Sequence, residues 1–230
     1  MTDSTPSSTP LPTPFDFAAA PLSAEVLRGQ WKLRRDSYAQ AHLYGDVRIR
    51  VHRCLTWLAV AQTRSATEAD TACLELWCAA GSLFARWSSA LGAPLPQREA
   101  TASFSRQIMH WDRDAIMPGV LDSIRVHATA MWSDPYLTER FRPATTDVQL
   151  STKPLLPAAP MPLLIGILER IGLTARQLAL GCTTYGGGQN RDAVERGVTT
   201  LHALLPAFLH VITEHGYVDE WGALCSPPRE

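Results

Sequence analysis

Over long stretches of this chain, the apolar residues recur at intervals of three and four, and this spacing limits the folds available to it. The pattern is clearest in residues 67–91, where a single helix would place on one face Cys73, Leu76, Trp77, Ala80, Phe84 and Trp87. No stretch shows the sustained alternation of apolar and polar residues that is typical of strands. The sequence therefore predicts an all-α fold, a bundle of helices with this segment deep in its core.

Six further stretches have helical spacing and punctuation. The expected helices cover residues 23–43, 46–64, 101–111, 118–132, 161–180 and 191–212. Ser23, Asp46 and Asn190 are expected N-caps, because their side chains can accept hydrogen bonds from the free amides of a first turn. Gly181 is the expected stop of the helix before it, since glycine readily adopts the left-handed conformation that ends many helices.

The chain has 230 residues and a net charge near −1, which fits one domain with a tail. Residues 1–22 are rich in Ser, Thr and Pro, and we expect them to form a disordered tail because they offer little apolar surface to bury. The helical domain is then expected over residues 23–230. Neither an export signal nor an apolar run long enough for a membrane span is visible, so we expect a cytoplasmic protein without membrane contact.

The five cysteines form no close pair of the kind that binds zinc or exchanges disulfides. We expect them to stay reduced, and we expect Cys54, Cys73 and Cys78 to serve in packing on apolar helix faces. The histidines of the last helical stretch also lack the spacing of metal ligands. No metal and no cofactor is therefore expected.

Charge is concentrated in residues 28–53, where seven lysines and arginines face two acidic residues, a local charge of about +5. Clustered cations gain affinity for nucleic acid by releasing counterions, which favours a phosphate-facing stripe. Arg48, Arg50, His52 and Arg53 are the candidates for contacting phosphate there. The alternative is a solvated helix face that acidic groups elsewhere in the fold balance.

Three stretches together resemble the HEPN family of small helical domains, many of which are metal-independent endoribonucleases. They are "RVHRCLTWLAVA" with the "LELWCAAGSLFARW" that follows it, "LIGILERIGLTARQLALGCTTYGGGQNRDAVERGVTTLHALLPAFLHVI", and the tail "EWGALCSPP". The most specific match is Asn190, Arg191 and Asp192 at the start of the final helix. The resemblance implies a HEPN-like bundle and a homodimer in which two motif helices face each other across a cleft.

Active members of the family resemble one another in an Arg, four intervening residues and a His near the end of the motif helix. In the aligned string "ARQLALG", Ala175 stands at the Arg position and Leu180 at the His position. Gly81 stands where members often have a polar Asn. The resemblance implies that the His assists proton transfer at the ribose hydroxyl and the Arg holds the scissile phosphate, and neither alanine nor leucine can do this.

Other residues near the lost motif could still contact a phosphate. Arg176 lies one position beyond the lost Arg, about 100° around the helix. Asn190 and Arg191 follow the glycines of "YGGGQN", whose amides either cradle an anion at the helix start or simply turn the chain. Leu178 and Leu180 would make the implied cleft apolar, which suits an interface better than a cleavage site.

Three hypotheses remain open. The first is a catalytically degenerate, dimeric HEPN-like module that binds RNA or a protein partner, in a setting such as defence or toxin–antitoxin biology. The second is a metal-independent endoribonuclease with a displaced set, Arg176, Arg191, Arg48 and His52. The third is a purely structural helical assembly module without nucleic-acid contact.

Overall fold

The computed structural model describes residues 22–37, 45–134, 137, 157–188, 190–216 and 221–225. The tail expected over residues 1–22 lies outside these ranges except for Leu22. The helices of the described chain are α1 (Ala24–Ser37), α2 (Gly45–Ala61), η2 (Ala66–Glu68), α3 (Ala69–Phe84), α4 (Gln97–Trp111), α5 (Ile116–Ser123), α6 (Arg125–Ser133), α7 (Pro160–Ala179), α8 (Arg191–Val211) and the π-helical turn η4 (Ile212–Gly216). The described strands are β1 (Trp87–Ser88) and β2 (Ala93–Pro94), which form a short antiparallel hairpin. The expected all-α class is confirmed.

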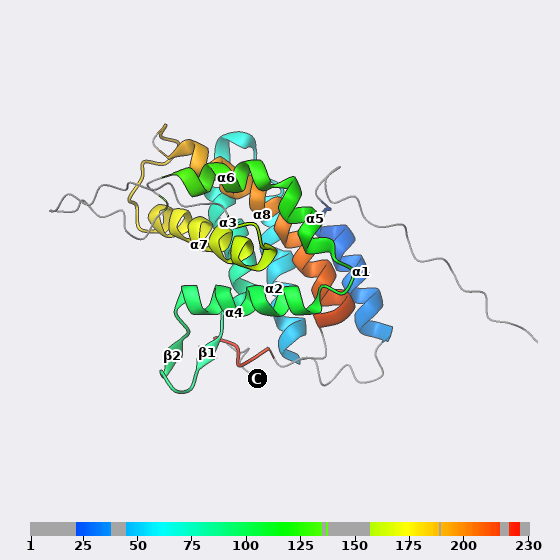
Figure 1. Ribbon diagram of the computed structural model, residues 1–230. Coiled ribbons are helices and arrows are strands. Elements are labelled where there is room, and N and C mark those ends of the chain that lie inside the picture. The colour runs from blue at the N-terminus through cyan, green and yellow to red at the C-terminus, as the bar shows by residue number, and fades with distance from the viewer. Residues whose placement is uncertain are drawn as a thin grey trace, which may run out of the picture.

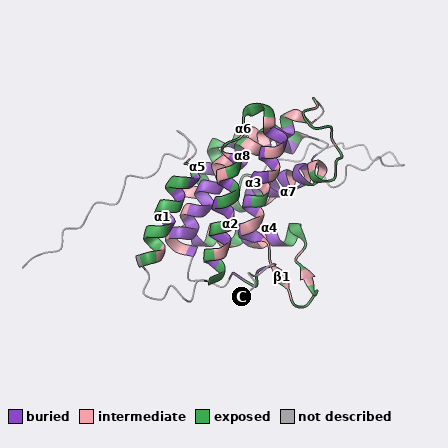
Figure 2. Cartoon of the chain, turned by 180° about the vertical axis from the view of Figure 1, so that it is seen from behind, coloured by how far each residue is buried: buried purple, intermediate pink, exposed green. Residues whose placement is uncertain are grey.

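Helix α8 runs through the middle of the bundle, with α1 at one edge and α7 at the other (Figure 1). It packs against α3, α5, α6 and α7, and its Leu201, Leu204 and Phe208 are fully buried. The Phe208 ring meets Phe104 of α4 edge-on, with ring centroids 5.1 Å apart. Exposed residues lie along the outer side of α1, which therefore closes the bundle at its edge (Figure 2).

The helix expected over residues 67–91 ends earlier, so the placement of Trp87 in the core is wrong. Ala85 turns to an extended conformation, with φ −64° and ψ 131°, and the chain enters the β1–β2 hairpin. The Leu95 amide then donates to the Arg86 carbonyl, and the Trp87 amide donates to the Ala223 carbonyl. Trp87 is 39% exposed because these long-range bonds replace the next helical turn.

Local details also differ from expectation at three other places. Residues 118–132 belong to two helices, because Ile124 leaves the helical conformation between α5 and α6. Asp46 lies in the first turn of α2 rather than at its cap. Cys78 is exposed on α3, whereas Cys54 and Cys73 are fully buried as expected.

A buried arginine fastens the C-terminal strap, which we define as residues 221–225, to the bundle. Arg50 of α2 is 1% exposed, and its guanidinium donates to four carbonyls, those of Leu83, Ala85, Gly222 and Ala223. Burial lowers the pKa of Arg50 to about 10, which still leaves it charged at neutral pH. The strap is thus held against α2 by one charged side chain.

None of the helices in the described ranges combines the length and the apolar character that a bilayer span requires.

Candidate anion-binding groove

A groove with a basic lining lies over α1 and α2. Its α1 side is formed by Arg28, Trp31, Lys32 and Arg35, which recur at three- and four-residue steps and so share one helix face. The adjacent row of α1, formed by Ala24, Leu27 and Trp31, is buried against the bundle, so the cations lie along its border. Amphipathic spacing in α1 therefore presents a row of cations to the groove.

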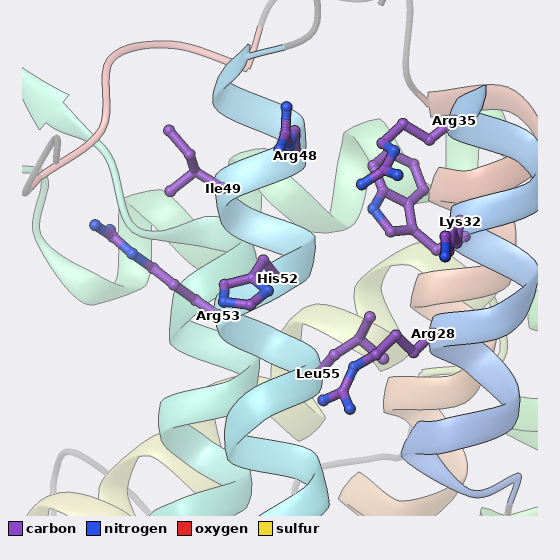
Figure 3. A pocket seen from close by; sticks show the side chains of 9 residues that line it. Arg28, Lys32, Arg35, Arg48, Ile49, His52, Arg53 and Leu55 are labelled. Carbon is purple, nitrogen blue, oxygen red and sulfur yellow. The ribbon is translucent and has the colours of Figure 1, made fainter.

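The α2 side of the groove repeats this design with two adjacent rows. Arg48, His52 and Leu55 form the row nearer α1, and Ile49 and Arg53 form the row beyond it. Arg28 and Arg35 extend from α1 toward α2, while Ile49 and Arg53 lie on the side of α2 away from α1 (Figure 3). Arg48 and His52, two of the expected phosphate contacts, thus share one face of α2 and both line the groove.

The groove concentrates positive charge, and three of its cations have no acidic partner among the described residues. No acidic side chain lines it among the residues placed by the structure, and its volume is about 510 Å³. Arg35 pairs with the neighbouring Asp36 at 2.7 Å. Within the described ranges, Arg28, Lys32 and Arg48 form no ion pair. Like charges that share a concave surface raise the local concentration of anions.

One of the arginines expected in the basic stripe does not belong to the groove. Arg50 follows Arg48 by two residues, which turns it by roughly 200° around α2 and into the core. All its described hydrogen bonds go to backbone carbonyls. Arg50 is thus a structural residue and cannot reach a phosphate at the surface.

The corner between α7 and α8 is shaped by backbone hydrogen bonds. Gly181 adopts φ +66°, the Cys182 amide donates to the Gln177 carbonyl, and the Gly181 amide donates to the Leu178 carbonyl. This is a Schellman motif, and it confirms Gly181 as the helix stop.

The positions that the HEPN resemblance singles out near the end of α7 differ in their surroundings. Ala175 is 1% exposed, so an Arg at this position would need space that the core has filled. Leu180 is 71% exposed just after the helix. Arg176 is exposed on α7 and does not line the basic groove. In α3, a side chain added at Gly81 would meet no neighbouring atom within 4 Å.

A buried aspartate anchors the glycine loop and the start of α8. Asp70 of α3 accepts a 2.6 Å hydrogen bond from the Gly186 amide and lies 3.2 Å from the Arg191 guanidinium. Arg191 also donates to the Thr67 carbonyl and pairs with Glu195. Arg191, a candidate phosphate contact by sequence, is thus already engaged in contacts that hold α8 to α3.

Asn190 occupies the N-cap position of α8 in the left-handed conformation, with φ 61°, and its side chain makes no capping hydrogen bond. Its carbonyl instead accepts from the amides of Ala193 and Val194. The displaced catalytic set is consequently divided: Arg48 and His52 face the groove on α2, while Arg176 and Arg191 belong to the α7–α8 corner.

The sequence reasoning did not single out three groove residues, Arg28, Lys32 and Arg35, although it counted them in the charged segment. Their signal is the spacing i, i+4 and i+7, which places all three on one helix face. Asp70 had no comparable signal, because its partners lie more than a hundred residues away. In the described ranges, no group of three or more His, Cys, Asp or Glu residues could hold a metal ion.

The comparisons with known proteins return no relative: no family model, no curated protein and no solved structure matches this chain.

Proposed function

We propose that this protein is a non-catalytic, HEPN-like RNA-binding protein, and that RNA phosphates bind in the groove over α1 and α2. The observation that carries the proposal is that Arg28, Lys32 and Arg48 line one groove and that none of them has an ion-pair partner in the described chain. If these cations belonged only to a solvated helix face, acidic groups from elsewhere in the fold should lie beside them and balance their charge. A concave basic surface that holds three cations without an ion-pair partner in the described chain favours a polyanionic ligand.

The state of the motif positions supports binding without cleavage. Ala175 is packed in the core and Leu180 is apolar, so neither can exchange a proton or neutralise a phosphate. Arg191 is held by Asp70 and Glu195. In this proposal, Ala175 and Arg191 hold the α7–α8 corner in place, and the corner has no residue left that could cleave RNA.

The resemblance further implies a homodimer, and we include it in the proposal. Two residues of the α7–α8 corner support an apolar contact there, because Leu180 and Tyr185 are 71% and 65% exposed. In the proposed homodimer these two side chains would supply apolar contact surface at the corner.

The test compares a groove variant with a charge-matched control. The triple variant Arg28→Gln, Lys32→Gln, Arg48→Gln removes the three uncompensated cations of the groove. The control, Arg106→Gln, Arg113→Gln, Arg125→Gln, removes the same charge from exposed positions that do not line it. The measurement is fluorescence anisotropy with a labelled single-stranded RNA over a series of salt concentrations.

We expect the groove variant to bind more weakly and to lower the magnitude of the slope of log K against log salt by about 2, because each lost phosphate contact on a single strand releases about 0.7 fewer counterions. The control should keep the wild-type slope. Equal slopes in both variants would contradict the groove as the RNA site. Absence of any RNA binding by the wild type would refute the proposal that this protein binds RNA.

The enzyme hypothesis is tested separately, by incubating the repurified protein with total RNA in EDTA. We expect intact RNA. Discrete fragments that end in a cyclic phosphate, and that disappear on His52→Gln, would identify a working ribonuclease and overturn the non-catalytic proposal.

A further inference from the structure

We infer that the groove recognises the terminal phosphomonoester of a nucleotide, as at a phosphorylated RNA end, in preference to the internal phosphodiesters of a strand. This inference rests on the proposed function and names the part of the RNA that is bound. A free nucleotide carries the same chemical group, so the experiment includes both sources.

Charge density favours the monoester. Arg28 and Arg35 are seven positions apart on α1, which corresponds to a rise of only about 10 Å along the helix. A phosphomonoester carries about −1.5 to −2 charges at neutral pH on three strongly accepting oxygens, whereas an internal phosphodiester carries one. Three cations that share one short cavity therefore match a single, more highly charged group better than an extended backbone.

The apolar residues of the groove favour a ligand with a ring beside its phosphate. Trp31 of α1 and Leu55 of α2 line the groove from rows that also carry Arg28 and Arg48. Trp31 and Leu55 are almost fully buried, 6% and 2% exposed, so the apolar surface that a ligand can reach is mainly the half-buried Ile49 of α2, which also lines the groove. A nucleobase or sugar ring can pack on an apolar surface of this kind, whereas a phosphate ion alone would leave the surface exposed to water.

The size of the groove agrees with a small terminal group. Its volume of about 510 Å³ lies inside the range of about 300–1,000 Å³ that small-molecule sites occupy. A groove that tracks a long strand would instead continue as a basic path. Among the described residues, the arginines of the α7–α8 corner, Arg176 and Arg191, do not extend the lining.

The experiment uses the full chain and one single-stranded RNA sequence made with a 5′-phosphate, a 3′-phosphate or hydroxyls at both ends. Anisotropy gives the Kd of each RNA for the wild type, the groove variant and the control variant. Uridine monophosphate, uridine and inorganic phosphate are then tested as competitors. We expect at least one phosphorylated RNA to bind about tenfold more tightly than the hydroxyl form, and this preference to be lost only in the groove variant.

Uridine monophosphate that competes better than both uridine and inorganic phosphate would support a joint site for ring and phosphate, filled by free nucleotides as well. Equal affinity of all three RNAs, with binding still weakened in the groove variant, would overturn end recognition and leave RNA binding intact. No binding of any RNA by the wild type would overturn the proposed function. It would overturn the terminal-nucleotide site as well if uridine monophosphate also fails to bind to the wild type.

Discussion

Replacement of Arg50 by methionine should detach the C-terminal strap and destabilise the bundle. Methionine keeps much of the apolar stem but has no donor for the four carbonyls that the guanidinium now satisfies. The carbonyl of the exposed Gly222 can turn to water, and that of Ala223 keeps the hydrogen bond from the Trp87 amide. Those of Leu83 and Ala85 lie at the buried and half-buried end of α3.

The expected magnitude comes mainly from these last two carbonyls. Each buried acceptor left without a donor costs about 1–3 kcal/mol. Removal of the buried charge offsets part of this cost, because the guanidinium is desolvated in the folded protein, as its lowered pKa indicates. We therefore expect Arg50→Met to lower the free energy of unfolding by about 3 kcal/mol, a large share of the total of about 5–15 kcal/mol for a domain.

Urea unfolding followed by far-UV circular dichroism measures this free energy. The matched control is Arg48→Met, an exposed position two residues away, which should change stability by less than about 0.5 kcal/mol. Near-UV circular dichroism reports the strap, because Trp221 stacks against Trp111 with ring centroids 4.9 Å apart. If Arg50→Met came within about 1 kcal/mol of the control, the account of Arg50 as the fastening of the strap would be refuted.

Two further predictions concern buried titratable groups. Burial raises the pKa of Cys73 to about 12 and the pKa of Cys54 well above its ordinary value. Iodoacetamide added to the native protein should therefore label the exposed Cys182 first. It should reach the two buried thiols only after denaturation. Peptide mass spectrometry checks this order, and rapid labelling of Cys54 in the native protein would contradict its burial in the core. Burial lowers the pKa of His202, so the unfolded chain takes up a proton there before the folded chain does, and stability falls as pH decreases through about 6.5. The decrease in Tm between about pH 7 and about pH 5 should be smaller in His202→Gln than in the wild type. An identical decrease in the two proteins would show that protonation of His202 does not cause the loss of stability.

Much of the bundle follows from short-range patterns. Val51, Leu55 and Leu58 are buried as their spacing predicts, because a helix brings residues three and four apart onto one face whatever surrounds it. Gly181 ends α7 for an equally local reason, since only a residue that tolerates a positive φ completes the Schellman motif. The shared position of Arg48 and His52 on the groove face of α2 also follows from their four-residue spacing alone.

The tertiary structure decided what those patterns leave open. Arg48 and Arg50 have the same charge and lie two residues apart, and only the packing of α2 against α3 and the strap makes one a surface cation and the other a core donor. Asp70 and Gly186 are 116 positions apart, so no local rule could have joined them. Sequence periodicity sets which face each helix presents, because that depends on neighbours within a few turns. Which faces meet, and hence where the basic groove opens, depends on contacts between distant segments that only the folded chain brings together.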